Sequence, residues 1–223
     1  MNRRRLLVLV AVAATTVVAL VPTAARAAFV ETFSQRGVAA AAGWEFCVPD
    51  TPMQGVTTCT RVFLFAFEGT ERGTDVEAFK GTRVCLTVET ISFREHGQGP
   101  GARNAIEGGC TAAPEGTLTV PRDLSSAELQ TTTVTITCSE GDCQPGSSRQ
   151  VTVSAGWTAV GPLEPTREHD RFVIDDCTEM VFVKRERRDA VAIGTLDGSS
   201  LASTTFADIT DGTLTTKSTC PTP

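Results

Sequence analysis

The sequence predicts an all-β protein, an antiparallel β-sandwich of the immunoglobulin-like or a related type with about 12 strands, held together by disulfides. Segments in which apolar and polar residues alternate recur at short intervals along the chain. Helical periodicity is confined to two short stretches, residues 38–42 and 124–129. Eight cysteines follow an apolar segment at the N-terminus. These three observations together favour a strand-rich fold that is cross-linked by disulfides.

The strand signal consists of runs of β-branched and aromatic residues bounded by Gly, Pro, Asp and Ser. The expected strands, in chain order, are residues 32–36, 44–48, 57–68, 83–93, 117–120, 131–138, 149–160, 170–174, 178–186, 189–196, 203–207 and 213–218. Polar segments at residues 68–74, 139–148 and 208–212 are expected to be loops or turns.

Alternation along single strands indicates which side chains face the core. Val84, Leu86 and Val88 share one face, and a slip in the pattern toward Ile91 predicts a bulge after Val88. Residues 62–67 are apolar on both faces, which predicts a central strand. Trp157 lies on the apolar face of an alternating strand and Trp44 lies just before a cysteine, so we expect both tryptophans in the core.

The first 27 residues have the layout of a secretory signal peptide. Three arginines open the segment, residues 6–21 form a nearly continuous apolar run, and small residues at 25–27 precede the expected cleavage site. Arg3 and Arg4 also fit a twin-arginine signal loosely, but the strongly apolar run favours the general secretory route. We therefore expect the mature protein to be secreted and extracellular. An uncleaved leader would instead be a short membrane anchor.

Residues 28–223 are expected to form one secreted β-sandwich domain, with a division near Pro121 and Arg122 as the alternative. Cleavage removes the leader's four arginines, which leaves 16 Lys and Arg against 26 Asp and Glu. Because an acidic chain repels phosphate backbones and anionic lipids, we expect no nucleic-acid partner and no membrane association after cleavage. The sequence does not specify an oligomeric state.

An even number of cysteines in an exported chain predicts a disulfide framework. Sequence alone allows 105 pairings of eight cysteines, and pairing sequence neighbours avoids threading. We therefore expect the pairs Cys47–Cys59, Cys85–Cys110, Cys138–Cys143 and Cys177–Cys220. A metal site is the rival reading, but there is no Cys-x-x-Cys motif and neither histidine lies near a cysteine pair.

No sequence motif identifies a catalytic or cofactor site, so we expect no cofactor. His169 lies between Glu168 and Asp170, but neighbouring strand residues point to opposite faces and no nucleophile elbow is present. His96 is expected at the end of a hairpin. Paired carboxylates at residues 175–176 and 208–211 are candidate calcium ligands, although neither follows the EF-hand pattern. A glycosidase carboxylate pair stays an alternative that the sequence does not locate.

Residues 184–189 form the only basic cluster after the leader, and Arg185, Arg187 and Arg188 are the candidate binding residues. They could hold an anionic polymer or a carboxylate ligand. A solvated strand pair and turn with internal ion pairs is the favoured reading. The loop at residues 139–148, closed by Cys138–Cys143, is the best candidate for the rigid exposed loop of an inhibitor of extracellular proteases or toxins.

The aromatic content argues against a carbohydrate module that stacks sugars on exposed rings. The chain has no Tyr and only two Trp, and both tryptophans are expected in the core.

The segment at residues 151–163 has an alternating strand that ends in Gly161-Pro162, and an Arg- and Cys-containing segment follows it before residues 190–198. In this arrangement the chain resembles secreted, β-rich actinobacterial proteins that are uncharacterised. Arginine outnumbers lysine 17 to 3, a bias typical of GC-rich bacterial genomes. The resemblance implies export, β structure and disulfides, and it implies no activity.

The function that the sequence favours is therefore a non-enzymatic secreted protein that binds an unknown protein or cell-envelope partner. Two alternatives stay open. One is a secreted hydrolase with an unrecognised site, in which His169 or a carboxylate pair would line a deep pocket. The other is an inhibitor of an extracellular protease or toxin.

Overall fold

A computed structural model describes residues 30–50, 56–74, 76–94, 103–141, 143–174, 177–202 and 204–220. The leader at residues 1–27, His96 and the carboxylates at 175–176 lie outside these ranges. The described chain is all-β and antiparallel, as predicted, and it has eleven strands rather than about twelve. They are β1 (Val30–Asp50), β2 (Val56–Gly73), β3 (Phe79–Arg94), β4 (Arg103–Ala113), β5 (Leu118–Thr119), β6 (Ser126–Glu140), β7 (Ser148–Ala159), β8 (Glu164–Ile174), β9 (Cys177–Leu196), β10 (Ser199–Leu201) and β11 (Thr204–Thr219).

Strand pairing closes on itself around the core. The order β9-β11-β1-β2-β3-β4-β6 continues through β7, which pairs with both β6 and β9. Two layers therefore face each other, as in a sandwich, but one continuous sheet supplies both. An immunoglobulin sandwich has two separate sheets instead. We call this closed part of the molecule the body.

Alternating residues of the strands fill the body. In β6 and β7, Val134, Ile136, Val151 and Val153 point inward between exposed threonines and serines. Both tryptophans are in the core, as predicted, and each is 1% exposed. Trp44 Nε1 donates to the Ala192 carbonyl at 3.2 Å, and Trp157 Nε1 to the Ala41 carbonyl at 2.9 Å. Each indole thus spans the two layers with its only polar group paired. The core cluster includes residues from both sides of Pro121 and Arg122.

Several local expectations were wrong because tertiary pairing extends the strands. Residues 38–42, which lie outside the expected strands, are the middle of β1, where Ala40 and Ala42 are buried. The expected turns at residues 187–188 and 208–212 lie inside β9 and β11. β2 continues to Gly73 through an expected loop. No bulge follows Val88, because β3 pairs with β2 and β4 without a register shift. Small or charged residues weaken the local strand signal, but neighbouring strands on both sides supply the missing stabilisation.

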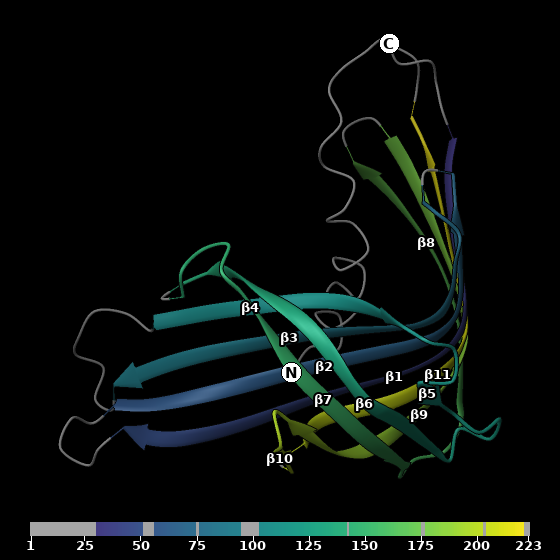
Figure 1. Cartoon of the computed structure of the whole chain (residues 1–223). Helices are drawn as coiled ribbons and strands as arrows, with labels where there is room; N and C mark the ends of the chain where they lie inside the picture. Colours follow the sequence, from purple (N-terminus) through teal and green to yellow (C-terminus); the bar gives the residue numbers. More distant parts are fainter. Residues whose placement is uncertain are drawn as a thin grey trace.

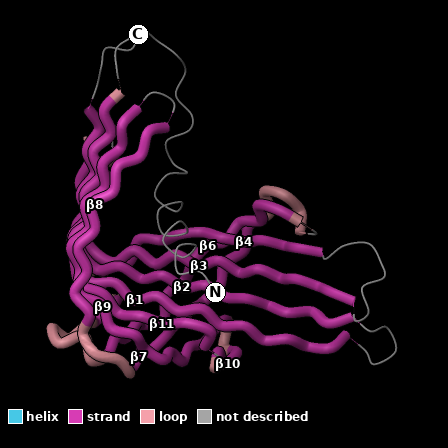
Figure 2. The backbone as a smooth tube through the Cα atoms, turned by 180° about the vertical axis from the view of Figure 1, so that it is seen from behind, coloured by secondary structure: helices cyan, strands magenta, loops and turns pink. Residues whose placement is uncertain are grey.

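The long strands turn sharply, so that the molecule has two arms (Figure 1), and the view from behind shows the same outline (Figure 2). Gly212, Gly37, Gly69 and Gly81 lie directly opposite one another on β11, β1, β2 and β3. A Cβ added at Gly37 would lie 2.1 Å from the Glu68 carbonyl oxygen. One added at Gly69 would lie 2.2 Å from the Arg36 carbonyl oxygen. This glycine row lets the backbones approach closely where a side chain would not fit.

The glycine row separates the body from a second part, which we call the projecting sheet. It consists of β8 with residues 177–186 of β9, 213–219 of β11, 30–36 of β1 and 70–73 of β2, paired in that order. Of the side chains described in this sheet, only Glu71 is buried. The projecting sheet is therefore a single layer without a core of its own.

The four disulfides join the cysteines that the nearest-neighbour argument pairs. Cys47–Cys59 links β1 to β2 and Cys85–Cys110 links β3 to β4, each at directly opposite positions with Cα atoms 4.0 Å apart. Cys138–Cys143 closes the β6–β7 hairpin, and Cys177–Cys220 links the ends of β9 and β11 in the projecting sheet. Four disulfides indicate an oxidising, extracellular-type environment.

We expect Gly37→Ala to lower the free energy of unfolding by about 1–3 kcal/mol, since overpacking against a fixed backbone has costs of this order. Gly156→Ala on β7 is the matched control, because a Cβ there would meet nothing within 4 Å. Urea unfolding followed by circular dichroism measures both. Equal destabilisation of the two variants would contradict the role given to the glycine row.

Candidate functional site

The basic cluster predicted from the sequence is split by the strand that carries it. Arg185 and Arg187 lie on one face of β9, and Arg188 lies on the core-facing side, opposite the buried Ile209. Arg188 Nη1 donates to the Asp123 carbonyl at 3.2 Å. The three candidate binding residues therefore do not converge on one ligand.

Arg185 and Arg187 lie beside carboxylates of neighbouring strands. Arg187 Nη2 is 2.8 Å from Asp189 Oδ1, and its Nε is 3.0 Å from Asp208 Oδ2. Arg185 Nη2 is 3.9 Å from Glu168 Oε1 on β8. The Nε–H groups of both arginines are buried and have no hydrogen-bond partner among the described residues. Arg187 Nε lies close to Asp208 Oδ2, but its N–H bond is not directed at that oxygen. These arginines are mainly engaged in internal ion pairs, which is the reading that the sequence favoured.

Asp208 is the most perturbed carboxylate of this cluster. Burial raises the pKa of Asp208 above its ordinary 3.8, and the nearby guanidinium groups of Arg187 and Arg185 lower that pKa only in part. Asp211 lies on the opposite face of β11, since residues an odd number of positions apart on a strand point to opposite faces. Asp208 and Asp211 thus do not form the single oxygen cluster that a calcium site in a turn would need.

His169 lies on β8 with its imidazole ring stacked on Phe182 of β9, the ring centroids being 4.4 Å apart. Glu168 and Asp170 point to the other face of β8, as the alternation of a strand requires. Neither of these neighbouring carboxylates therefore orients His169 in the manner of a catalytic triad.

Glu45, Cys47 and Cys59 bring three ligand-type side chains together, with their ligand atoms within 4.8 Å. The two sulfur atoms are joined in a disulfide, and Arg61 Nε donates to Glu45 at 2.6 Å. A disulfide offers no thiolate for a metal ion, so the cluster acts as a structural brace.

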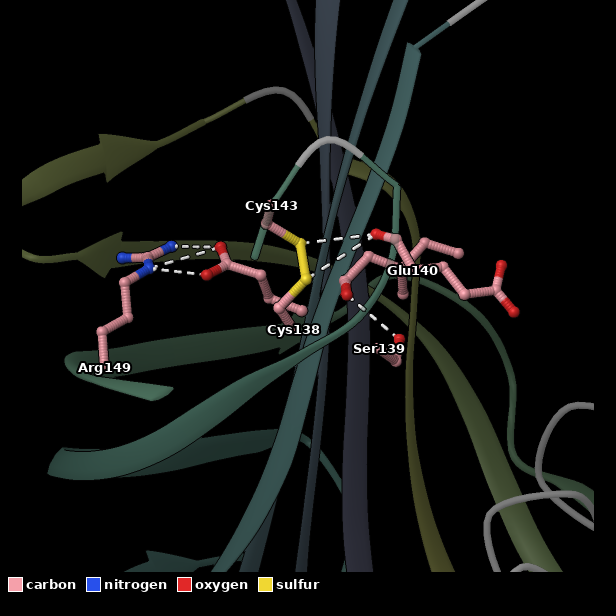
Figure 3. The surroundings of a disulfide bond; sticks show 7 residues. Cys138, Ser139, Glu140, Cys143 and Arg149 are labelled. Carbon is pink, nitrogen blue, oxygen red and sulfur yellow. Dashed lines mark hydrogen bonds and ion pairs between the residues drawn. A yellow bond between two sulfur atoms is a disulfide. The ribbon is translucent and has the colours of Figure 1, made fainter. Parts of the chain in front are cut away.

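The hairpin tip between β6 and β7 is held in place from several sides. Figure 3 shows Cys138–Cys143, with Ser139 and Arg149 beside it. Gly146 N donates to the Cys138 carbonyl at 3.0 Å, and Ser139 Oγ donates to the Ile106 carbonyl at 3.0 Å. Arg149 Nη2 is 2.7 Å from Glu107 Oε2 on β4. The described residues 144–147 are exposed, so the tip is a rigid projecting loop.

Two shallow cavities lie outside these clusters. One of about 400 Å³ is lined by residues of β4, β6 and the segment between them: Thr111, Ala112, Ala113, Pro114, Thr117, Gln130, Thr131, Thr132 and Thr133. The other, of about 300 Å³, is lined by Phe46, Leu196, Asp197, Ser199, Ser200 and Leu201. Asp197 accepts a hydrogen bond from the Thr152 amide at 2.8 Å. Neither cavity has His169 or a carboxylate pair in its lining.

The strongest charge pattern is one that sequence reasoning missed. Directly opposite residues of neighbouring strands share a face of a sheet. One row across the projecting sheet contains Arg167, Lys184, Thr213 and Arg36; the next contains His169, Phe182, Thr215, Ser34 and Arg72; the third contains Arg171, Met180, Lys217 and Thr32. These three rows hold six basic residues and no acid, whereas the next row on the same side, at the base of the sheet, contains Glu186 and Asp211. We call the three rows the basic face.

The opposite side of the same sheet has the reverse charge. Its three corresponding rows contain Glu168, Val183, Leu214, Gln35 and Glu71; Asp170, Val181, Thr216 and Phe33; and Phe172, Glu179, Ser218 and Glu31. They include five acids and no Lys or Arg, but Arg185 of the adjoining row pairs with Glu168, and Arg83 of β3 pairs with Glu71. We call this side the acidic face. Glu71 is 6% exposed and accepts hydrogen bonds from Arg83 Nη2 at 2.6 Å and Gln35 Nε2 at 3.0 Å.

No protein-family model matches the chain, and neither a curated protein nor a solved structure matches it significantly. Across the ranges that the structure describes, no helix has the length and apolar character needed to span a membrane.

Asp208→Asn is expected to change how stability depends on pH. Because its folded pKa is raised, wild-type Asp208 adds stability below pH 3.8, and that stability is lost as the pH rises through the folded value. The variant should therefore gain stability relative to wild type as the pH rises, which urea unfolding across this range measures.

Glu107→Gln is the control of opposite sign. Hydrogen bonds from Arg149 lower the pKa of Glu107 below its ordinary 4.5. The stability that Glu107 adds is therefore present above pH 4.5 and lost as the pH falls through the lowered value. Parallel pH profiles for the two variants would contradict the assigned causes.

Proposed function

We propose that the chain is a non-enzymatic binding protein of the extracellular space or cell envelope, and that the projecting sheet is its binding surface. The observation that carries this proposal is the single-layer character of that sheet. Its strands extend beyond the body, and nearly all of their described side chains are accessible on both faces. A surface built in this way contributes little to the core, so its construction is better explained by contact with a partner.

Exposed apolar side chains on both faces support the same reading. Phe172 lies on the acidic face, whereas Phe182 and Val173 lie on the side of the basic face, and all three are exposed. A single-layer sheet with two wet faces gains little hydrophobic stabilisation. Cys177–Cys220 compensates by fixing the far ends of β9 and β11 covalently. The chain thus maintains an ordered surface away from its core.

The arrangement of charged groups also favours binding over catalysis. In the body, Arg149 pairs with Glu107, and at the base of the projecting sheet Arg187 pairs with Asp189 and Asp208. These groups neutralise one another between strands instead of converging on a cavity. Export by the leader, expected from the sequence, would deliver such a protein to the cell envelope.

The double variant Cys177→Ser/Cys220→Ser tests this proposal. Wild-type mature protein is expected to sediment with purified cell-envelope fragments of its natural host. The variant should sediment at least about fivefold less, because its projecting sheet loses its covalent end and about 2–4 kcal/mol of stabilisation. Cys138→Ser/Cys143→Ser is the matched control, since it opens a disulfide of the body. Absence of wild-type sedimentation would end the proposal.

The braced hairpin tip favours a second candidate function, inhibition of an extracellular protease. Inhibitors of this kind present a rigid exposed loop, and rigidity lowers the entropic cost of binding. The disulfide, the hydrogen bonds and the Arg149–Glu107 pair described above supply that rigidity.

A panel of secreted serine, cysteine and metalloproteases tests the second candidate. An inhibitor would reduce the residual activity of at least one protease, and Cys138→Ser/Cys143→Ser would weaken this inhibition because the loop loses its brace. Cys177→Ser/Cys220→Ser serves here as the control with an intact hairpin. Full protease activity at every molar ratio would exclude the second candidate.

A further inference from the structure

The basic face has charges that are free to meet a ligand. Its six basic residues are exposed: Arg36, Arg72, Arg167, Arg171, Lys184 and Lys217. None of them forms an ion pair or a side-chain hydrogen bond with any part of the described chain. The arginines of the body and of the glycine-row region, by contrast, are mostly paired with carboxylates. Binding an anion at the basic face would therefore break no internal ion pair.

The spacing of these cations suits a chain of anions better than one small anion. Arg167 and Arg171 are four residues apart on β8, which separates their Cα atoms by about 13 Å. Lys184 and Arg36 are in one row with β11 between them, which separates them by about 10 Å. A single phosphate or carboxylate would reach only one or two of the six. A linear polyanion lying across the strands could meet most of them.

The residues between the cations indicate which polyanion fits. They are mainly hydroxyl side chains, among them Thr32, Ser34, Thr213 and Thr215. Hydroxyl groups donate and accept hydrogen bonds and match the hydroxyls of sugars. At the centre of the face lies the stacked pair of His169 and Phe182, with Phe182 41% exposed. The exposed apolar residues Val30 and Val173 lie in the end row, next to the row of Arg171 and Lys217.

We infer that the basic face of the projecting sheet binds a linear acidic polysaccharide of the cell envelope. This inference rests on the proposed function and names its ligand. The polymer is held by charge and hydroxyl hydrogen bonds rather than by stacking on Trp or Tyr. The acidic face on the other side of the same layer repels the polymer, so binding is restricted to one side.

Affinity electrophoresis and calorimetry with alginate, a linear polyuronate, test the inference. Wild-type protein is expected to bind alginate with an affinity that falls as salt is added, and not to bind neutral dextran. Arg167→Gln/Arg171→Gln/Lys184→Gln should bind about tenfold more weakly, since each exposed contact contributes modestly. The thermal midpoint should be unchanged, because the three side chains have no partner in the described chain.

Arg122→Gln is the matched single-charge control for Arg167→Gln, because Arg122 is exposed and is not one of the residues of the projecting sheet. Arg167→Gln should weaken alginate binding at least about twofold, and Arg122→Gln should leave it unchanged. Asp170→Asn/Glu179→Gln removes charge from the acidic face and should not weaken binding. A loss that followed net charge alone, equal at Arg122 and Arg167, would overturn the inference.

Two further probes separate other sources of negative charge. Vesicles of phosphatidylglycerol and phosphatidylcholine that bound where alginate did not would assign the face to a membrane and overturn the inference. Single-stranded DNA that bound more tightly than alginate would overturn it as well. If envelope fragments retained the triple variant as well as wild type, the proposed function would stand and this inference would fall.

Discussion

The glycine row is the constraint on which the two-part architecture depends. Four neighbouring strands lack a side chain at directly opposite positions, and at Gly37, Gly69 and Gly212 the neighbouring backbone lies closer than a Cβ would allow. On one side of the row the strands curve around a core that contains both tryptophans. On the other side the same strands continue as a single layer. One set of long strands thus builds both a stable body and an exposed surface.

The strands keep their register across the glycine row, so the side of each strand that faces the core in the body becomes the basic face in the projecting sheet. The inward side of β1, β9 and β11 carries Ala40, Ala192 and Ile209 in the body. Beyond the row the same side carries Arg36, Lys184 and Lys217. A shift of one residue in any of these strands would move its charges to the other face. The net charge of −6 for the whole chain therefore does not show that the projecting sheet has two faces of opposite sign.

The sequence was a good guide to whatever depends on local pattern. Alternation predicted the all-β class and the inward Trp157, and sequence neighbours gave the pairs that the four disulfides join. The length of the strands could not be predicted from local pattern. Ala40 and Asp208 are poor strand formers, and they lie in strands because neighbouring strands pair with them on both sides. The basic face could not be predicted from the sequence either, since its six residues come from five separate strands. Residues 184–188 looked like one cluster only because adjacency in sequence ignores the two faces of a strand.

The position of β11 between β1 and β9 determines when the molecule can be completed. β1 is the first described strand and β11 the last, and they pair along nearly their whole length. Until β11 has emerged, β1 lacks one neighbour and the sheet cannot close around Trp44. Contacts of such long sequence separation form slowly. For a chain delivered N-terminus first, assembly therefore waits for its final strand, and the chain must stay unassembled and protected from aggregation until then.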